Sequence, residues 1–203
     1  MKKAVFICSH LYSGSSALYA AMEQNARIEG YKSKNDNVYE SNANLVSLFS
    51  KKHKMNNSSS IYMDEILFNH QICSKSLYKS AKFIYLIRDP EKCVSQIVTY
   101  HKYKPEFAAK YYTFRLRRLC EMASKTPGAV FLTYDQLCNG FGVDLISNYL
   151  ELKFPIEFNP NSVQIYSNKF STDLLGSVLR SQIYDSYERY LYFLKNQSLL
   201  RPQ

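Results

Sequence analysis

Lys3-Ala-Val-Phe-Ile-Cys8 is an apolar run of the length of a buried strand, and a polar turn, Ser9-His-Leu-Tyr-Ser-Gly-Ser-Ser16, follows it directly. Residues 17–22 favour a helix. A strand, a turn rich in Ser and Gly, and a helix bring free backbone N–H groups and the positive end of a helix dipole to one point. The stretch therefore predicts the first unit of an α/β fold, with an anion site in its loop.

This loop lacks the lysine of loops that bind ATP for hydrolysis. Such loops follow the pattern GxxxxGK[ST], in which Lys precedes the final hydroxyl residue. Here Gly14 is followed by Ser15 and Ser16. The predicted anion is therefore something other than the triphosphate and magnesium of an ATPase.

Residues 82–101 predict a second phosphate site. The apolar strand 83–87 ends at Arg88, and Asp89 and Pro90 are residues that helices favour as N-cap and first position. Ser95 falls in the second turn of that helix, so we expect a hydroxyl beside an always-charged guanidinium. Two anion sites about 70 residues apart in the chain suit a ligand with phosphate groups on both sides of a nucleoside.

The two segments, Tyr12-Ser-Gly-Ser-Ser16 and Ile87-Arg-Asp-Pro90 with Ser95, resemble the sulfotransferases that use 3′-phosphoadenosine 5′-phosphosulfate (PAPS). Segments 130–137 and 145–152 are similar to that family's strand ending in Tyr-Glu-Asp-Leu and the helix after it, so the resemblance covers about residues 3–170. It implies a transferase with a P-loop-like sulfotransferase fold, a three-layer α/β/α arrangement around a central parallel sheet. PAPS would be the co-substrate, and adenosine 3′,5′-bisphosphate (PAP) would be the product. The resemblance implies no metal.

The resemblance also assigns nucleotide-binding residues. Arg88 and Ser95 would hold the 3′-phosphate, and Lys169, in a short Ser167–Phe170 element, would close over it. The loop would hold the 5′-phosphosulfate through His10, Tyr12, Ser13, Gly14, Ser15 and Ser16. Many members carry Lys or Arg where this chain has Tyr12, so we expect the cation that stabilises the leaving group to come from Lys169 or His10.

Sulfuryl transfer to a hydroxyl also requires a base for the proton of the acceptor. Glu40, which follows a predicted second strand, is the first candidate. Asp64, after the third predicted strand, is the second, and His70 is the third. His53 offers the same imidazole chemistry.

The chain alternates between strand and helix patterns, which predicts a parallel sheet covered by helices on both faces. Both motifs fall at strand ends, so the binding crevice is expected at the carboxyl edge of the sheet. The expected strands are residues 3–8, 37–40, 61–63, 83–87 and 129–133, and the expected helices are 15–25, 44–52, 66–79, 90–101, 106–124, 135–150 and 174–196.

The composition is that of a packed globular protein. The 203 residues, 46% of them hydrophobic and 15% aromatic, are expected to form a single domain over 1–203. No apolar stretch is long enough to span a membrane. Five cysteines without a CxxC pair predict a reducing, cytoplasmic compartment and no metal cage.

The net charge of +9 is concentrated in one segment. Residues 75–118 contain 11 Lys and Arg and 3 acidic residues, a balance of +8. The positive electrostatic field of this segment would attract a nucleotide with several negative charges. In the alternative interpretation, Arg115-Leu-Arg-Arg118 is simply a solvated helix face.

Three functions remain open from the sequence. The first is a sulfotransferase that acts on a hydroxyl of a small molecule, glycan or peptide, with no nucleic-acid partner. The second is a P-loop kinase-like phosphotransferase, which is disfavoured by the missing Lys after Gly14 and by the missing acidic metal ligand after an apolar strand. The third is a non-catalytic nucleotide binder. The acceptor and the oligomeric state are not predicted.

Overall fold

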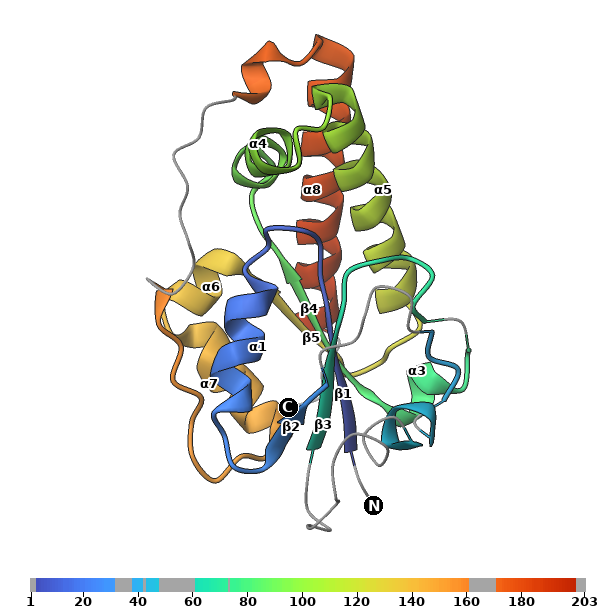
Figure 1. Ribbon diagram of the computed structural model, residues 1–203, viewed down its shortest axis with the longest axis vertical. Coiled ribbons are helices and arrows are strands. Elements are labelled where there is room, and N and C mark those ends of the chain that lie inside the picture. The colour runs from blue at the N-terminus through green and yellow to red at the C-terminus, as the bar shows by residue number, and fades with distance from the viewer. Residues whose placement is uncertain are drawn as a thin grey trace.

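A parallel β-sheet forms the centre of the protein. The computed structural model describes residues 3–31, 38–41, 43–47, 61–72, 74–160 and 171–199. Within them, the strand order is β2-β3-β1-β4-β5, and every pairing is parallel (Figure 1). The strands are β1 Lys3–Cys8, β2 Ile28–Gly30, β3 Ile61–Ile66, β4 Lys82–Ile87 and β5 Val130–Thr133.

Helices cover both faces of this sheet (Figure 1). The helices are α1 Ser15–Glu23, α3 Leu77–Ser80, α4 Pro90–His101, α5 Pro105–Ala123, α6 Tyr134–Cys138, α7 Phe141–Leu150 and α8 Ser177–Leu199, with a 3-10 helix, η2, at Thr172–Leu174 and a further helical segment at 43–47. Val5 and Ile7 belong to one core cluster, shared with α1 and α7. Phe6 and Cys8 belong to a second cluster, shared with α4, α5 and α8. Successive side chains of β1 point to opposite faces of the sheet, so they contribute in turn to the two core clusters. The predicted α/β/α architecture is confirmed.

Two of the predicted strands need correction. The strand beside β3 is β2, Ile28–Gly30, which sequence analysis missed. The predicted strand 37–40 has only an isolated bridge between Tyr39 and Ile72 among its described residues. The third strand is longer than predicted and ends at Ile66, so Asp64 lies inside it and does not follow it.

Two of the predicted helices are also wrong in extent. Among the described residues of 66–79, the α-helical ones are 77–79, which belong to α3. Residues 67–71 form a turn in which Oε1 of Gln71 accepts hydrogen bonds from the N–H groups of Leu67 and Phe68, each 2.9 Å long. The predicted helix 135–150 is two helices, since Gly140 has a φ of 86° and begins α7. Part of the predicted helix 44–52 lies outside the described residues.

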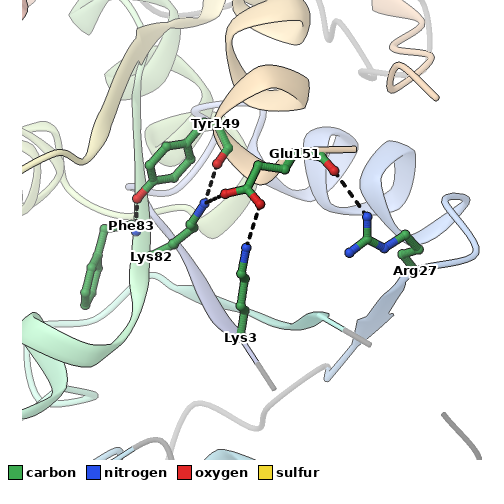
Figure 2. A network of polar contacts seen from close by, with 6 residues as sticks. All are labelled: Lys3, Arg27, Lys82, Phe83, Tyr149 and Glu151. Atoms are coloured by element: carbon green, nitrogen blue, oxygen red, sulfur yellow. Dashed lines mark hydrogen bonds and ion pairs between the residues drawn. The ribbon is translucent and has the colours of Figure 1, made fainter. Parts of the chain in front are cut away.

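Glu151 ties the amino ends of the central strands to α7 (Figure 2). Its carboxylate pairs with Lys3 of β1 at 3.0 Å and with Lys82 of β4 at 3.5 Å. Lys82 also donates to the carbonyl of Tyr149, and the hydroxyl of Tyr149 accepts from the N–H of Phe83 at 3.2 Å. These contacts lie at the edge of the sheet opposite to the predicted crevice.

None of the helices in the described part of the chain is both long and apolar enough to cross a membrane.

Candidate functional site

The loop between β1 and α1 has a backbone that only a few residues can adopt. Tyr12 and Gly14 both have positive φ angles, 62° and 92°. A Cβ atom on Gly14 would lie 2.5 Å from Cδ2 of Tyr134, so glycine is required for space as well as for backbone conformation. Ser13 and Ser15 are buried at the start of α1, and the N–H of Ser15 donates to Oγ of Ser13 at 3.3 Å. The loop therefore turns tightly around the helix N-terminus.

His10 connects this loop to the end of β4. Its Nδ1–H donates to the carbonyl of Leu11 at 3.0 Å, and its Nε2 accepts from the N–H of Arg88 at 3.1 Å. The ring is fully buried, and burial is the main cause that lowers its pKa from 6.5 to about 4. His10 is therefore a neutral structural residue at pH 7. The expectation that it supplies a cation is wrong.

Arg88 lies where β4 ends and is 4% exposed. Its guanidinium stacks on the ring of Tyr134 at 4.2 Å from the centroid, and Nη1 donates to the carbonyl of Tyr12 at 3.4 Å. The hydroxyl of Tyr112 donates to the carbonyl of Arg88 at 2.8 Å. These contacts fix the arginine between α6 and the loop at residues 9–14, which we call the phosphate loop after its proposed role.

Among the described residues, three buried polar side-chain atoms at this edge have no hydrogen-bond partner. They are Nε of Arg88, Oγ of Ser95 and Oγ of Ser9, which follows β1. Asp89 caps α4 by accepting from the N–H of Lys92 at 3.2 Å, as predicted, and Cys93 Sγ donates to the carbonyl of Tyr12 at 3.5 Å. The amino end of α4 thus lies against the phosphate loop. Buried donors without partners are rare in proteins, and a bound phosphate oxygen would satisfy such donors.

Arg115, which the sequence analysis placed in a basic segment or on a solvated helix face, is a buried structural residue. It is 1% exposed on α5, and it donates from Nε to the carbonyl of Ser9 at 2.7 Å and from Nη2 to the carbonyl of Ile66 at 2.6 Å. Burial lowers the pKa of its guanidinium. The residue joins the carboxyl ends of β1 and β3, so it is not part of a solvated face.

A sequence signal for Arg115 did exist. It lies three residues after Tyr112 and four before Leu119, which are both fully buried on α5. An arginine on the apolar stripe of an amphipathic helix indicates a buried, hydrogen-bonded charge. Arg117, by contrast, has a side chain that is 75% exposed and pairs with Glu121 at 3.4 Å.

An acidic residue lies beside the phosphate loop, contrary to the sequence analysis. The hydroxyl of Ser16, in the first turn of α1, donates to the two carboxylate oxygens of Glu65 at 3.4 and 3.5 Å. Glu65 is near the end of the apolar strand β3, which pairs with β1. A loop hydroxyl and a strand acid hold Mg²⁺ in P-loop NTPases.

The three candidate bases lie in different environments. Asp64 is buried in β3, and its carboxylate accepts hydrogen bonds from the hydroxyl of Tyr39 and from the N–H of Glu65. Glu40 is exposed, and so is His70, whose ring stacks on Phe68 at 6.0 Å.

The structure brings the segments of Glu40 and His70 together. The N–H of Tyr39 donates to the carbonyl of Gln71 at 2.7 Å, so the residues that flank these two candidates are paired. The turn 67–71 that carries His70 follows β3 at the carboxyl edge, and Arg115 Nη1 donates to Asn69 there at 2.9 Å. Asp64 is instead engaged within the core.

Lys169 and His53 lie outside the described residues. Among the residues that the structure does describe, no group of three or more His, Cys, Asp or Glu side chains could hold a metal ion.

Known proteins resemble this one in fold and only remotely in sequence. No protein-family model and no curated protein matches the sequence. Mouse sulfotransferase SULT7A1, in a crystal structure with PAP, aligns with 99% of this chain and 86% of its own at a TM-score of 0.53 and 12% identity. Retinol dehydratase, in complex with androsterone and the inactive cofactor PAP, aligns with 96% of this chain and 80% of its own at a TM-score of 0.42 and 11% identity. Together with the all-parallel sheet between two helical layers, the first alignment shows that this chain has the α/β fold of a sulfotransferase.

Proposed function

We propose that the protein is a PAPS-dependent sulfotransferase that transfers a sulfuryl group to a hydroxyl acceptor. The observation that supports the proposal is that, in the described part of the chain, Nε of Arg88 at the end of β4 and Oγ of Ser95 in α4 are buried without a hydrogen-bond partner. A bound phosphate group would offer oxygens to both donors. The phosphate loop on neighbouring β1 supplies the second anion site that a nucleotide with 3′- and 5′-phosphate groups needs.

The residues of the chain divide the work of binding PAPS. Arg88 and Ser95 would hold the 3′-phosphate. The backbone N–H groups at the start of α1 would bind the 5′-phosphosulfate, together with the hydroxyls of Ser13, Ser15 and Ser16. Lys169 would add a cation for the leaving 5′-phosphate, because His10 is neutral. Tyr12 stands where many of the resembled sulfotransferases carry Lys or Arg, but its side chain is not a cation. We therefore do not assign the stabilisation of the leaving group to Tyr12.

Transfer forms a bond between the acceptor oxygen and sulfur and breaks the bond from sulfur to the 5′-phosphate oxygen. The electron pair leaves with PAP, and the acceptor proton goes to a base. Because sulfuryl transfer resembles loose phosphoryl transfer, positioning and charge stabilisation provide most of the rate. We assign the base to Glu40, which is exposed and whose neighbour Tyr39 is paired with Gln71 of the turn after β3. His70 is the second candidate for the base. Asp64 is the third, because its carboxylate is buried and accepts a hydrogen bond from Tyr39.

Ligand-induced stabilisation tests the nucleotide part of the proposal. A ligand at 100 times its Kd adds about 2.7 kcal/mol to the free energy of unfolding. Adenosine 3′,5′-bisphosphate should raise the Tm accordingly, AMP should raise it less because it lacks the 3′-phosphate, and ATP with Mg²⁺ should raise it least. Equal stabilisation by ATP with Mg²⁺ would contradict the proposal. Transfer is then tested with labelled PAPS against sugars, phenols and tyrosine peptides, and a bisphosphate binder that modifies none of them would be a non-catalytic relative.

The contact between Ser16 and Glu65 favours a second candidate, a magnesium-dependent phosphotransferase. The two functions make opposite predictions for Glu65. Glu65→Gln would remove magnesium-dependent ATP turnover from a phosphotransferase and would leave the binding of adenosine 3′,5′-bisphosphate by a sulfotransferase intact. Turnover of ATP that depends on Glu65 would favour the second candidate.

A further inference from the structure

Aromatic rings form a continuous row that starts at the half-buried Tyr12 of the phosphate loop and continues over exposed residues of α4 and α5. The ring of Tyr12 lies 5.7 Å from that of His101 and 6.0 Å from that of Tyr100, both on the last turn of α4. His101 stacks on Tyr103 at 5.3 Å and an interplanar angle of 21°. Tyr103 meets Phe107 of α5 edge to face at 5.0 Å. We call these five residues the aromatic row.

The aromatic row is more exposed than core packing requires. Tyr100, Tyr103 and Phe107 are 40%, 43% and 57% exposed, and His101 is exposed as well. Large aromatic side chains that gather on a surface mark a binding site more often than single ones do. The row also begins at Tyr12, whose carbonyl accepts hydrogen bonds from Arg88 and Cys93. A ligand on the row would thus reach the loop that is proposed to hold the phosphosulfate.

The charge around the aromatic row is positive. Lys102 and Lys104 are exposed in the turn between α4 and α5 and flank Tyr103 in the chain. Glu106, in the first turn of α5, is the nearest acidic residue in the sequence. Four of the five residues of the row, all except Tyr12, lie within the segment 75–118, whose balance is +8. An occupant with negative charge is therefore complementary.

We propose that the aromatic row binds the acceptor and that this acceptor is a saccharide chain with acidic groups. The inference rests on the proposed sulfotransferase function. Sugar rings present apolar C–H faces that pack on aromatic rings, and their carboxylates pair with lysines. Successive rings of such a chain match successive side chains of the row, and every sugar ring carries hydroxyls that can accept a sulfuryl group.

The shape of the aromatic row favours this occupant over two others. A single phenol would need an enclosed slot to bury its ring, whereas these rings are about half exposed in a row. A single-stranded nucleic acid also combines stacking with negative charge. Its phosphates would, however, bring one charge for every base, and the exposed cations described in the turn itself are Lys102 and Lys104.

A tryptophan in place of Tyr103 reports binding directly, because the chain contains no tryptophan. Tyr103→Trp keeps the row aromatic and gives a single tryptophan, whose emission can be excited separately from that of the tyrosines. Short oligomers of hyaluronan and of alginate should change its emission saturably, and neutral maltodextrins should bind more weakly. The proposal would be overturned if polyglutamate bound as tightly as the acidic saccharides, or if oligothymidylate bound more tightly than they do. It would also be overturned if the acidic saccharides gave no saturable change in emission.

Further variants test whether the saccharides bind at the aromatic row. In the Tyr103→Trp background, Tyr100→Ala with Phe107→Ala should weaken saccharide binding by about tenfold or more, since two ring contacts are lost. Phe154→Ala is the matched control, because Phe154 is an exposed aromatic residue on the segment after α7. Lys102→Gln with Lys104→Gln should reduce the salt dependence of binding. An equal loss with Phe154→Ala would contradict the assignment.

Nucleotide affinity separates a failure of this inference from a failure of the proposed function. Adenosine 3′,5′-bisphosphate is titrated with the same proteins. Normal bisphosphate binding without saccharide binding would refute the inference and leave the sulfotransferase proposal standing. Saccharide binding without bisphosphate binding would refute the sulfotransferase proposal, and with it the role of the saccharide as an acceptor.

Discussion

The backbone N–H of Arg88 donates to Nε2 of His10 at 3.1 Å, and this bond joins the loops that follow β1 and β4. It can form only while Nε2 is unprotonated, so the imidazole must be neutral. The two proposed phosphate sites are therefore coupled through one buried ring. Protonation of that ring would break the bond and leave a charge among the guanidinium groups of Arg88 and Arg115, which both lower its pKa further.

His10 should make the folded state sensitive to acid. Its folded pKa of about 4 is below its ordinary 6.5, so the unfolded chain binds more protons between these pH values. Stability is fully present above pH 6.5 and is lost as the pH falls towards 4, by an amount of up to about 3 kcal/mol. Urea unfolding at pH 7.5, 6.5 and 5.5 measures this loss before carboxylates titrate strongly.

His10→Gln is the matched variant for this experiment, because an amide can donate and accept without titrating. Its stability at pH 7.5 should be lower, but its dependence on pH between 7.5 and 5.5 should be flatter than that of the unmodified protein. Parallel curves for the two proteins would mean that His10 is not the titrating group.

Arg88→Ala should weaken adenosine 3′,5′-bisphosphate binding by about 2 to 4 kcal/mol, because a buried phosphate loses a charge-assisted partner. Ser95→Ala should cost about 1 kcal/mol, the value of one hydrogen bond. Isothermal titration measures both. AMP and adenosine 5′-phosphosulfate serve as controls that lack the 3′-phosphate, and Arg117→Ala is the control for a general loss of charge. A loss as large with either control ligand would show that Arg88 does not contact the 3′-phosphate.

Arg115→Met should destabilise the fold by about 2 to 4 kcal/mol, since the buried carbonyl of Ser9 would lose its charged donor and that of Ile66 would keep only the bond from the N–H of Ser9. Arg117→Met, on the exposed face of the same helix, should change the free energy of unfolding by less than about 0.5 kcal/mol. Urea unfolding at pH 7 compares the two. Similar small effects would indicate that water replaces the Arg115 contacts.

The positions of the β1–α1 loop and of α4 could be predicted from the sequence, because the interactions that determine them are between residues close together in the chain. An apolar run in β1, Gly14 in a left-handed conformation and the Asp89 N-cap each act within a few residues. The turn 67–71 was mistaken for helix because its hydrogen bonds go to the side chain of Gln71. The edge strand β2 has three residues and pairs only with β3, so no periodicity reveals it. The contact between Ser16 and Glu65 joins the first turn of α1 to the end of β3, and it arises because β1 and β3 are neighbours in the sheet.

Gly14→Ala tests the packing of the phosphate loop. The new Cβ would clash with the ring of Tyr134 at 2.5 Å and would impose a φ of 92° on a residue with a side chain. We expect a loss of bisphosphate affinity of about tenfold or more, together with a lower Tm. Gly14→Ala with Tyr134→Ala removes the clash but keeps the backbone strain, so it should recover part of the Tm. No recovery would assign the whole effect to the backbone.

Glu40→Gln tests the proposed base. The side chain keeps its size, so bisphosphate binding should be unchanged, while the transfer rate to an alcohol should fall by about 10² to 10⁴. An acidic phenol that is already ionised at pH 7 should be affected much less, because it has no proton to lose. His70→Gln and Glu65→Gln are measured in parallel, since His70 lies on the segment paired beside Glu40 and Glu65 lies against the phosphate loop. Whichever variant shows the selective loss with alcohols identifies the base, and unchanged alcohol turnover by Glu40→Gln would remove Glu40 from the mechanism.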